Sequence, residues 1–81
     1  MRPLKEIASE IERDCGSKPW YVYAEAYVTP MKSLNTINDM YYADSADSIV
    51  RYALSNLTYW RGDTARRIKA ELNDMLKAVA A

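Results

Sequence analysis

A stripe of apolar side chains near the C-terminus is the feature that most restricts the fold. Between Thr64 and Val79 these side chains recur every three or four residues, and charged or amide side chains occupy most of the other positions. The apolar positions are Ala65, Ile68, Leu72, Met75, Leu76 and Val79. A helix with one apolar stripe gains most of its stability from packing that stripe against other elements. The rest of the chain must therefore supply a surface that covers this helix.

The N-terminal segment, residues 3–14, also has apolar side chains at helical spacing. Its inward positions are Leu4, Ile7, Ala8 and Ile11. Pro3 suits the first turn of a helix, because its missing N–H would have no partner there. Gly16 is expected to end this helix in the left-handed conformation that glycine adopts readily.

A further helix is expected after residue 44. Asp44 is placed to act as its N-cap, and Asp47, three residues later, to reach back as in a capping box. Asp47 also lies four residues before Arg51, which is the spacing of a favourable ion pair. The inward positions of this helix are Ile49, Val50, Ala53 and Leu57. Gly62 is expected to separate it from the last helix.

Residues 19–34 fit two interpretations. Apolar side chains at positions 20, 22, 24, 26 and 28 alternate with tyrosines and a glutamate, which is a strand pattern. A lone strand needs a partner, however, and no other segment alternates over five or more residues. We therefore expect a helix, with Pro30 starting a new turn or kinking it, and a short strand near residues 20–28 is the alternative.

The connection that follows, residues 35–43, holds turn-forming residues without periodicity. A chain of 81 residues is long enough for one hydrophobic core. The predicted fold class is all-α: a single domain over residues 1–81, folded as a small bundle of three to four helices. An α+β fold that contains the short strand is the alternative.

Composition narrows the classes of function. The chain has no His and one Cys, which excludes Ser-His-Asp and Cys-His catalytic sites and zinc sites with four Cys or His ligands. No cofactor-binding motif is present, so we expect a protein that is not an enzyme and has no metal or cofactor. Neither an apolar run of about 18 residues nor a secretory signal is found. We therefore expect a cytoplasmic protein without a membrane partner.

The aromatic residues point to a binding surface. The chain has seven Tyr, two Trp and no Phe, although a buried Tyr hydroxyl needs a hydrogen-bond partner and Phe does not. Some of these rings should reach the surface, where tyrosine is enriched at protein interfaces. The candidate partner-binding residues are Tyr23, Tyr27, Asp39, Tyr41 and Tyr42. The alternative is that these tyrosines lie at the core margin, with the ring packed and the hydroxyl in water.

The local excess of basic charge lies between residues 61 and 69. Its members are Arg61, Arg66, Arg67 and Lys69. Such a surface can bind phosphate groups, and a small nucleic-acid-associated regulator is the alternative function. Asp63 lies four residues before Arg67 and Glu71 four after it, so pairing along the helix accounts for much of this charge. Because the net charge of the chain is also zero, we expect no nucleic-acid partner.

Several runs in the C-terminal half resemble small proteins encoded by phages and prophages. They are Asp44-Ser45-Ala46, Ser48-Ile49-Val50, Ala53-Leu54-Ser55-Asn56 and the run from Trp60 to Leu72. That family has no assigned activity, but the resemblance implies an origin in a mobile genetic element. Such genomes carry many small proteins that bind and block host machinery. The resemblance therefore implies a host protein or protein complex as partner. We expect a non-enzymatic protein–protein interaction module that inhibits a host defence complex, in the manner of anti-CRISPR proteins.

Overall fold

The computed structural model describes residues 2–80 of the chain. In this range four helices and a two-stranded antiparallel sheet follow one another in the order α1 (Leu4–Cys15), α2 (Tyr21–Met31), β1 (Met40–Tyr41), β2 (Asp44–Ser45), α3 (Ala46–Ser55) and α4 (Asp63–Ala80). The predicted small helical bundle is therefore confirmed, with a short sheet added to it. The alternative strand near residues 20–28 is wrong, because residues 21–28 belong to α2.

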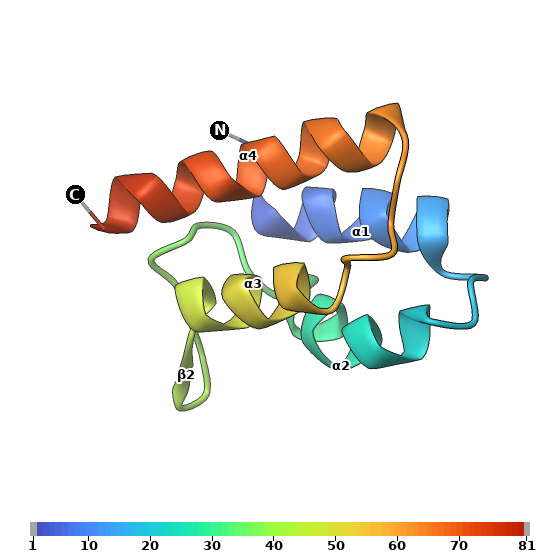
Figure 1. Ribbon diagram of the computed structural model, residues 1–81. Coiled ribbons are helices and arrows are strands. Elements are labelled where there is room, and N and C mark those ends of the chain that lie inside the picture. The colour runs from blue at the N-terminus through green and yellow to red at the C-terminus, as the bar shows by residue number, and fades with distance from the viewer. Residues whose placement is uncertain (1, 81) are drawn as a thin grey trace.

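The helices form two layers. In Figure 1, α4 lies over α1, and α3 lies beside α2 below them. The turn that joins α1 to α2 and the segment that joins α3 to α4 lie at the same end of the molecule. The hairpin of β1 and β2 projects from the opposite end. Segments distant in sequence therefore lie together at the end away from the hairpin.

The core lies between the layers and takes one face from each helix. The largest fully buried side chains are Leu4, Ile7, Ile11, Cys15, Val28, Met31, Leu34, Val50, Leu57, Ile68 and Leu72. The apolar stripe predicted for the last helix is confirmed as far as Leu76, which is 8% exposed. The inward position predicted for Val79 is wrong, since 37% of its surface is exposed. The last turn of α4 extends past the elements that cover the rest of the helix (Figure 1).

Packing, rather than the alternation seen in the sequence, decides the structure of α2. Its buried residues are Tyr21, Ala24, Val28 and Met31, at intervals of three or four. Val22, which the strand pattern would place beside Ala24 on one face, is 62% exposed. Pro30 lies in the last turn of the helix, which ends one residue later. The spacing of the buried residues is thus helical, and α1 and α3 cover them.

Two residues predicted to end or begin helices act differently in the structure. Gly16 follows α1 with a φ of −62°, so the left-handed conformation predicted for it is wrong. Its N–H donates to the carbonyl oxygen of Glu12 at 2.8 Å, and a Cβ atom at this position would lie 2.5 Å from that oxygen. Glycine fits this position because it has no Cβ atom to collide with that oxygen. The N-cap of α3 is Ser45 rather than Asp44, because Oγ of Ser45 accepts the N–H of Ser48.

The connection between α2 and α3 was expected to be irregular, which is wrong in part. Within it, β1 pairs with β2, with Met40 opposite Ser45 and Tyr41 opposite Asp44. Tyr42 follows in the turn with a φ of 54°, a left-handed conformation that is uncommon for residues other than glycine. Asp44 therefore belongs to a strand and cannot form the predicted capping box. Strands of two residues are too short to show a periodic pattern in the sequence.

Candidate functional site

A hollow between α2, the hairpin and α3 combines several of the predicted binding residues, and we call it the tyrosine groove. Its volume is about 260 Å³, and it is lined by Ala26, Tyr27, Pro30, Tyr41, Asp44, Ser48, Ile49 and Tyr52. Ile49 is 5% exposed and belongs to the core. The groove therefore joins the apolar core to a rim of three tyrosine rings and one carboxylate.

Each tyrosine ring of the groove contacts another tyrosine ring. Tyr27 of α2 stacks on Tyr52 of α3, with ring centroids 5.4 Å apart and an interplanar angle of 24°. Tyr41 meets Tyr42 edge to face, with centroids 4.8 Å apart and an angle of 83°. Tyr27 and Tyr41 are half-buried, whereas Tyr52 and Tyr42 are 57% and 88% exposed. The groove thus presents aromatic surface whose position is already restricted.

The groove carries a carboxylate without a cation beside it. Asp44 is exposed, and among the described residues no ion pair or side-chain hydrogen bond includes it. The nearby Asp47 pairs instead with Arg51 at 3.8 Å, as predicted from their spacing. An unpaired carboxylate next to aromatic faces is an environment that favours a positively charged ligand group.

Three of the predicted partner-binding residues lie outside the groove lining, and they are Tyr23, Asp39 and Tyr42. The carboxylate of Asp39 accepts the backbone N–H groups of Asn35 and Thr36 at 2.9 and 3.0 Å, and the Thr36 hydroxyl at 3.0 Å. These hydrogen bonds hold the pKa of Asp39 below its usual range, with the Thr36 N–H making the largest contribution. Asp39 therefore closes the loop after α2. Tyr23 is 67% exposed on α2, one turn before Tyr27.

Sequence analysis missed Tyr52 and Asp44 as members of the site. Tyr52 lies between the inward positions of the helix that was predicted there, so an exposed tyrosine next to the core could have been found from its position. Asp44 was instead interpreted as a helix cap. No local pattern shows that it faces Tyr27, because the two residues are 17 positions apart (44 − 27).

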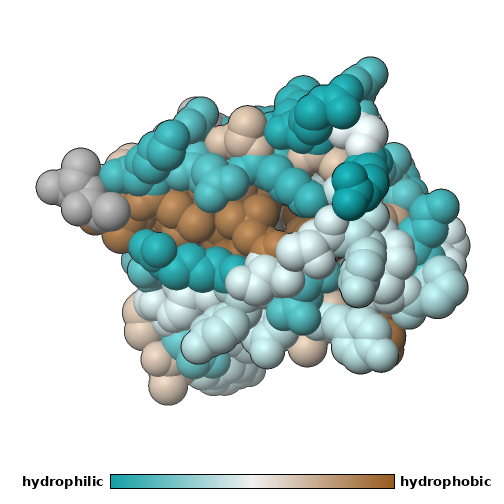
Figure 2. All heavy atoms as spheres, viewed as in Figure 1, coloured by the Kyte–Doolittle hydropathy of each residue, from teal (hydrophilic) through white to brown (hydrophobic). Residues whose placement is uncertain are grey.

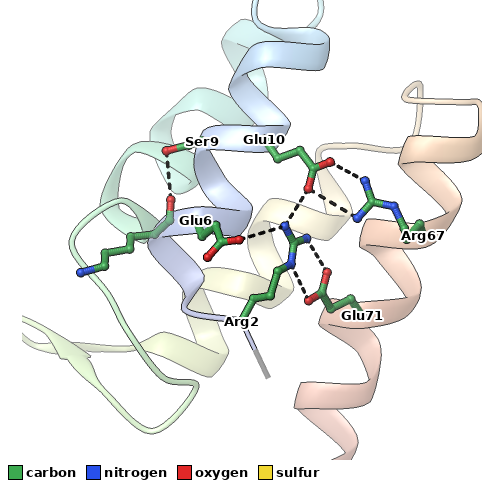
Figure 3. A network of polar contacts seen from close by, with 7 residues as sticks. Arg2, Glu6, Ser9, Glu10, Arg67 and Glu71 are labelled. Atoms are coloured by element: carbon green, nitrogen blue, oxygen red, sulfur yellow. Dashed lines mark hydrogen bonds and ion pairs between the residues drawn. The ribbon is translucent and has the colours of Figure 1, made fainter.

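The predicted basic residues separate into different environments, and Arg67 joins an ion-pair network that we call the α1–α4 seam. Arg2 donates to Glu71 at 3.0 and 2.6 Å and to Glu10 at 2.8 Å. Glu10 also accepts from Arg67, as Figure 3 shows. Arg67 therefore pairs with α1, and the predicted pairs of Arg67 with Asp63 and with Glu71 are wrong. The network joins the N-terminal segment to α4 through side chains 57 to 69 positions apart.

The other basic residues, Arg61, Arg66 and Lys69, take no part in the seam. Arg66, rather than Arg67, binds Asp63. Lys69 donates from Nζ to the carbonyl oxygen of Trp60 at 2.8 Å. Arg61 is exposed and takes part in no ion pair among residues 2–80. Three of the four predicted phosphate-binding residues, Arg61, Arg66 and Lys69, therefore line one hollow, whereas Arg67 is drawn into the seam.

A second apolar surface is the visible edge of the core. Figure 2 shows an apolar strip below α4. A hollow of about 360 Å³ lies between the end of α4 and the loop after α2, with Ile37 and Met75 in its lining. These side chains are 9% and 2% exposed, so most of their surface already packs within the protein. The lining of this hollow includes no aromatic side chain, and its charged side chain, Arg2, is already bonded to Glu10 and Glu71.

The remaining candidate groups have structural roles. Cys15 is buried, its thiol donates to the carbonyl oxygen of Ile11 at 3.0 Å, and burial raises the pKa of the thiol to about 11. A thiol in this state is a poor nucleophile. Within residues 2–80, no group of three or more His, Cys, Asp or Glu side chains is placed to hold a metal ion. None of the helices described is both long enough and apolar enough to cross a membrane.

Comparisons with protein-family models, with curated proteins and with solved structures found no match to this chain. The resemblance to phage and prophage proteins and the partner that it implies therefore stay predictions.

Proposed function

We propose that the chain is a non-enzymatic protein-binding module and that the tyrosine groove is its contact surface. The observation that carries the proposal is the grouping of Tyr27, Tyr41 and Tyr52, from three separate elements, around one hollow with an apolar floor. Aromatic side chains in a concave, well-packed surface are the residues that most often anchor a protein partner. The groove has this combination of shape and side chains.

The arrangement of the groove favours tight binding for its size. Tyr27 and Tyr52 are stacked in the free protein, and Tyr41 is held against Tyr42. Tyrosine has few rotatable bonds, and rings that are already placed lose little further freedom when a partner binds. The elements that carry these rings pack on the core, so the groove does not have to fold on binding.

The charge of the groove favours a basic contact residue on the partner. Asp44 offers a carboxylate at the rim, and the ring faces of the tyrosines attract cations. A Lys or Arg side chain of the partner can meet both groups. In this proposal, Asp44 mainly speeds association and excludes acidic partners, and the rings supply most of the binding free energy.

The resemblance of the C-terminal half to phage and prophage proteins supports a host protein or complex as the partner. Four of the groove residues, Asp44, Ser48, Ile49 and Tyr52, lie in that half. We therefore propose that the chain inhibits a host defence complex by occupying one of its surfaces. Such inhibition needs no catalytic group.

Affinity capture from a bacterial host lysate, followed by quantitative mass spectrometry, tests the protein-binding function. The tagged wild-type protein is compared with Tyr52→Ala and with Tyr59→Ala. Tyr59 is a matched control, because it is 70% exposed and lies outside the groove lining. Loss of an aromatic anchor costs about 2 kcal/mol or more, so recovery of the partner should fall about tenfold or more with Tyr52→Ala only.

Circular dichroism of each variant confirms that it is folded before the captured proteins are compared. Equal recovery of every host protein by the wild type and by both variants would show that the groove is not the contact surface. A lysate in which no protein is enriched over the resin alone would also count against the proposal.

A further inference from the structure

The end of the molecule opposite the hairpin brings basic and aromatic side chains together from three segments. Lys18 and Trp20 lie between α1 and α2, Tyr59 and Arg61 lie between α3 and α4, and Lys69 lies in α4. Both connecting segments lie at this end in Figure 1. We call these five residues the basic end. None of them lines the tyrosine groove.

Two hollows meet at the basic end. The first has a volume of about 390 Å³, and the rings of Trp20 and Tyr59 are part of its lining. The second has a volume of about 280 Å³, and its lining includes Arg66 and Lys69. Arg61 lines both hollows, so an aromatic hollow and a basic hollow share a wall.

The positive charge of the basic end is not neutralised within the part of the chain that the structure describes. Lys18 and Arg61 form no ion pair there. The ammonium group of Lys69 is bonded to the carbonyl oxygen of Trp60, 2.8 Å away, and not to a carboxylate. The carboxylate of Asp14, which also lines the first hollow, accepts the indole N–H of Trp60 at 2.6 Å. Lys18 and Arg61 are therefore exposed, Lys69 is half-buried, and Asp14, the one carboxylate in the lining of the two hollows, is already bonded.

The positive charge of the basic end affects the pKa of Lys69. Burial lowers the pKa of Lys69, and the positive charge of Arg61 lowers it further. The two side chains repel each other across the second hollow. An anion placed between them would replace this repulsion with attraction to both groups. The lowered pKa thus agrees with the charge distribution that the geometry shows.

The aromatic side chains give the basic end a second kind of contact besides its positive charge. Tyr59 is 70% exposed and Trp20 is half-buried. A cationic surface beside exposed rings is the combination by which proteins hold the backbone and the bases of unpaired nucleic acid. We infer that the basic end binds a nucleotide, with the phosphate near Arg61 and Lys69 and the base against Tyr59 and Trp20.

This inference goes beyond the proposed protein-binding function, because it uses a different surface. A DNA duplex is not the expected ligand, since a chain with a net charge of zero offers no long basic stripe. The ligand chemistry is a phosphate joined to an aromatic base. Both a free nucleotide and an unpaired strand supply it, and the experiment separates these sources.

Nuclear magnetic resonance of the ¹⁵N-labelled protein tests the inference directly. The chain has two Trp residues, so two indole N–H signals report on Trp20 and Trp60. Titration with ADP should shift both signals, and adenosine, which lacks phosphate, should bind about tenfold or more weakly. A short oligothymidylate is titrated in parallel. Tighter binding of the oligonucleotide than of ADP assigns the site to a strand, and the reverse assigns it to a free nucleotide.

Matched variants separate this site from a general effect of charge. Arg61→Gln should weaken ADP binding about fivefold or more. Arg51→Gln should not change it, because Arg51 is exposed on α3 and lines neither hollow. Tyr59→Ala should weaken binding and Tyr52→Ala should not, which reverses their roles in the protein-binding experiment. Oligonucleotide binding should also weaken about sevenfold between 50 and 200 mM salt if two phosphates are neutralised.

Three results would overturn the inference. The first is the absence of indole shifts at millimolar ADP in the folded protein. The second is equal affinity for adenosine and ADP, which would show that the phosphate does not contribute to binding. The third is an equal effect of Arg61→Gln and Arg51→Gln. Because Arg61 is exposed and unpaired in the described residues, its substitution is not expected to unfold the protein.

Discussion

The tyrosine groove and the α1–α4 seam use polar side chains in opposite ways. At the seam, Arg2 lies between Glu10 and Glu71, so each charge has an opposite charge within hydrogen-bond distance. In the groove, Asp44 has no cation beside it and the tyrosine rings meet one another at the rim. A surface whose charges are paired within the protein holds the fold together. A surface whose carboxylate lacks such a partner is free to meet another molecule.

This difference also separates stability from binding. The seam lies over the core contacts of α1 and α4, so changes there should act mainly on folding. The groove residue Tyr52 is 57% exposed, so changes there should act mainly on affinity. Four predictions test whether the two regions are as separate as their chemistry indicates.

The largest effect is expected beneath the seam. Leu72 is fully buried on α4, and Leu72→Ala should lower the free energy of unfolding by about 2–5 kcal/mol. Val79→Ala, at a partly exposed position on the same helix, should lower it by less than about 1 kcal/mol. Urea denaturation followed by circular dichroism measures both. Similar losses for the two variants would mean that α4 is not packed as described.

The next effect concerns the groove. Tyr52→Ala should weaken binding of a purified partner by about 2 kcal/mol or more. Its loss of the contact with Tyr27 should lower the free energy of unfolding by only about 0.5–1.5 kcal/mol. Calorimetric titration and urea denaturation give the two quantities. The opposite result is that Tyr52→Ala unfolds the protein, while the variant kept folded by a stabilising buffer binds the partner as tightly as the wild type. Tyr52 would then support the fold and not the binding surface.

An intermediate effect is expected from pH at the seam. The side chain of Arg67, together with Arg2, holds the pKa of Glu10 below its usual range, and Arg2 does the same for Glu71. Because these carboxyl groups have a lower pKa in the folded protein than in the unfolded chain, they stabilise the fold at neutral pH. This contribution is lost as the pH falls through their folded-state values, below about pH 5.

Arg2→Gln should remove much of that dependence. We expect it to lower the free energy of unfolding by about 1 kcal/mol at pH 7 and to flatten the decline below pH 5. Arg13→Gln is the control, since Arg13 is exposed and forms no ion pair in the described residues. Urea denaturation at pH 7 and pH 3.5 measures the effect. An unchanged acid-induced loss in Arg2→Gln would show that the seam does not act through these charges.

The smallest effect is expected from the groove carboxylate. Asp44→Asn should reduce affinity for a basic partner by less than about 1 kcal/mol, mainly through a slower association rate. The difference from the wild type should shrink as salt screens the charge. Surface plasmon resonance at two ionic strengths gives both rates. An unchanged association rate, with faster dissociation instead, would place Asp44 in the buried centre of the interface.

The elements that could be predicted from the sequence are those with a long helical period. The segments assigned to α1 and α4 differ from the observed helices by one residue at each end, because their apolar residues repeat over three or more turns. Residues 20–28 show a strand pattern, and the absence of a partner strand favoured the correct helix. The hairpin was missed, since pairs of two residues leave no pattern to recognise.

The candidate site could be predicted only in part. The composition indicated a tyrosine surface, and Tyr27 and Tyr41 do line the groove. Asp39 was predicted to bind a partner because of its charge. In the structure its carboxylate instead accepts hydrogen bonds from backbone N–H groups of its own loop. Tyr52 could have been found from its position between the inward residues of its helix, whereas the place of Asp44 depends on the hairpin.

The sequence by itself determined the helical class, the buried stripe of the last helix and the absence of histidine side chains. These features depend on local spacing or on which residues are present, and neither requires knowledge of distant neighbours. Only the tertiary structure decided that Arg67 pairs with Glu10 and that Lys69 and Arg61 are left near each other without a carboxylate. It also decided that three tyrosines meet around one hollow. The physical reason is that ion pairs and ring contacts act over a few ångströms in space, and helix packing sets those distances for residues that are far apart in the chain.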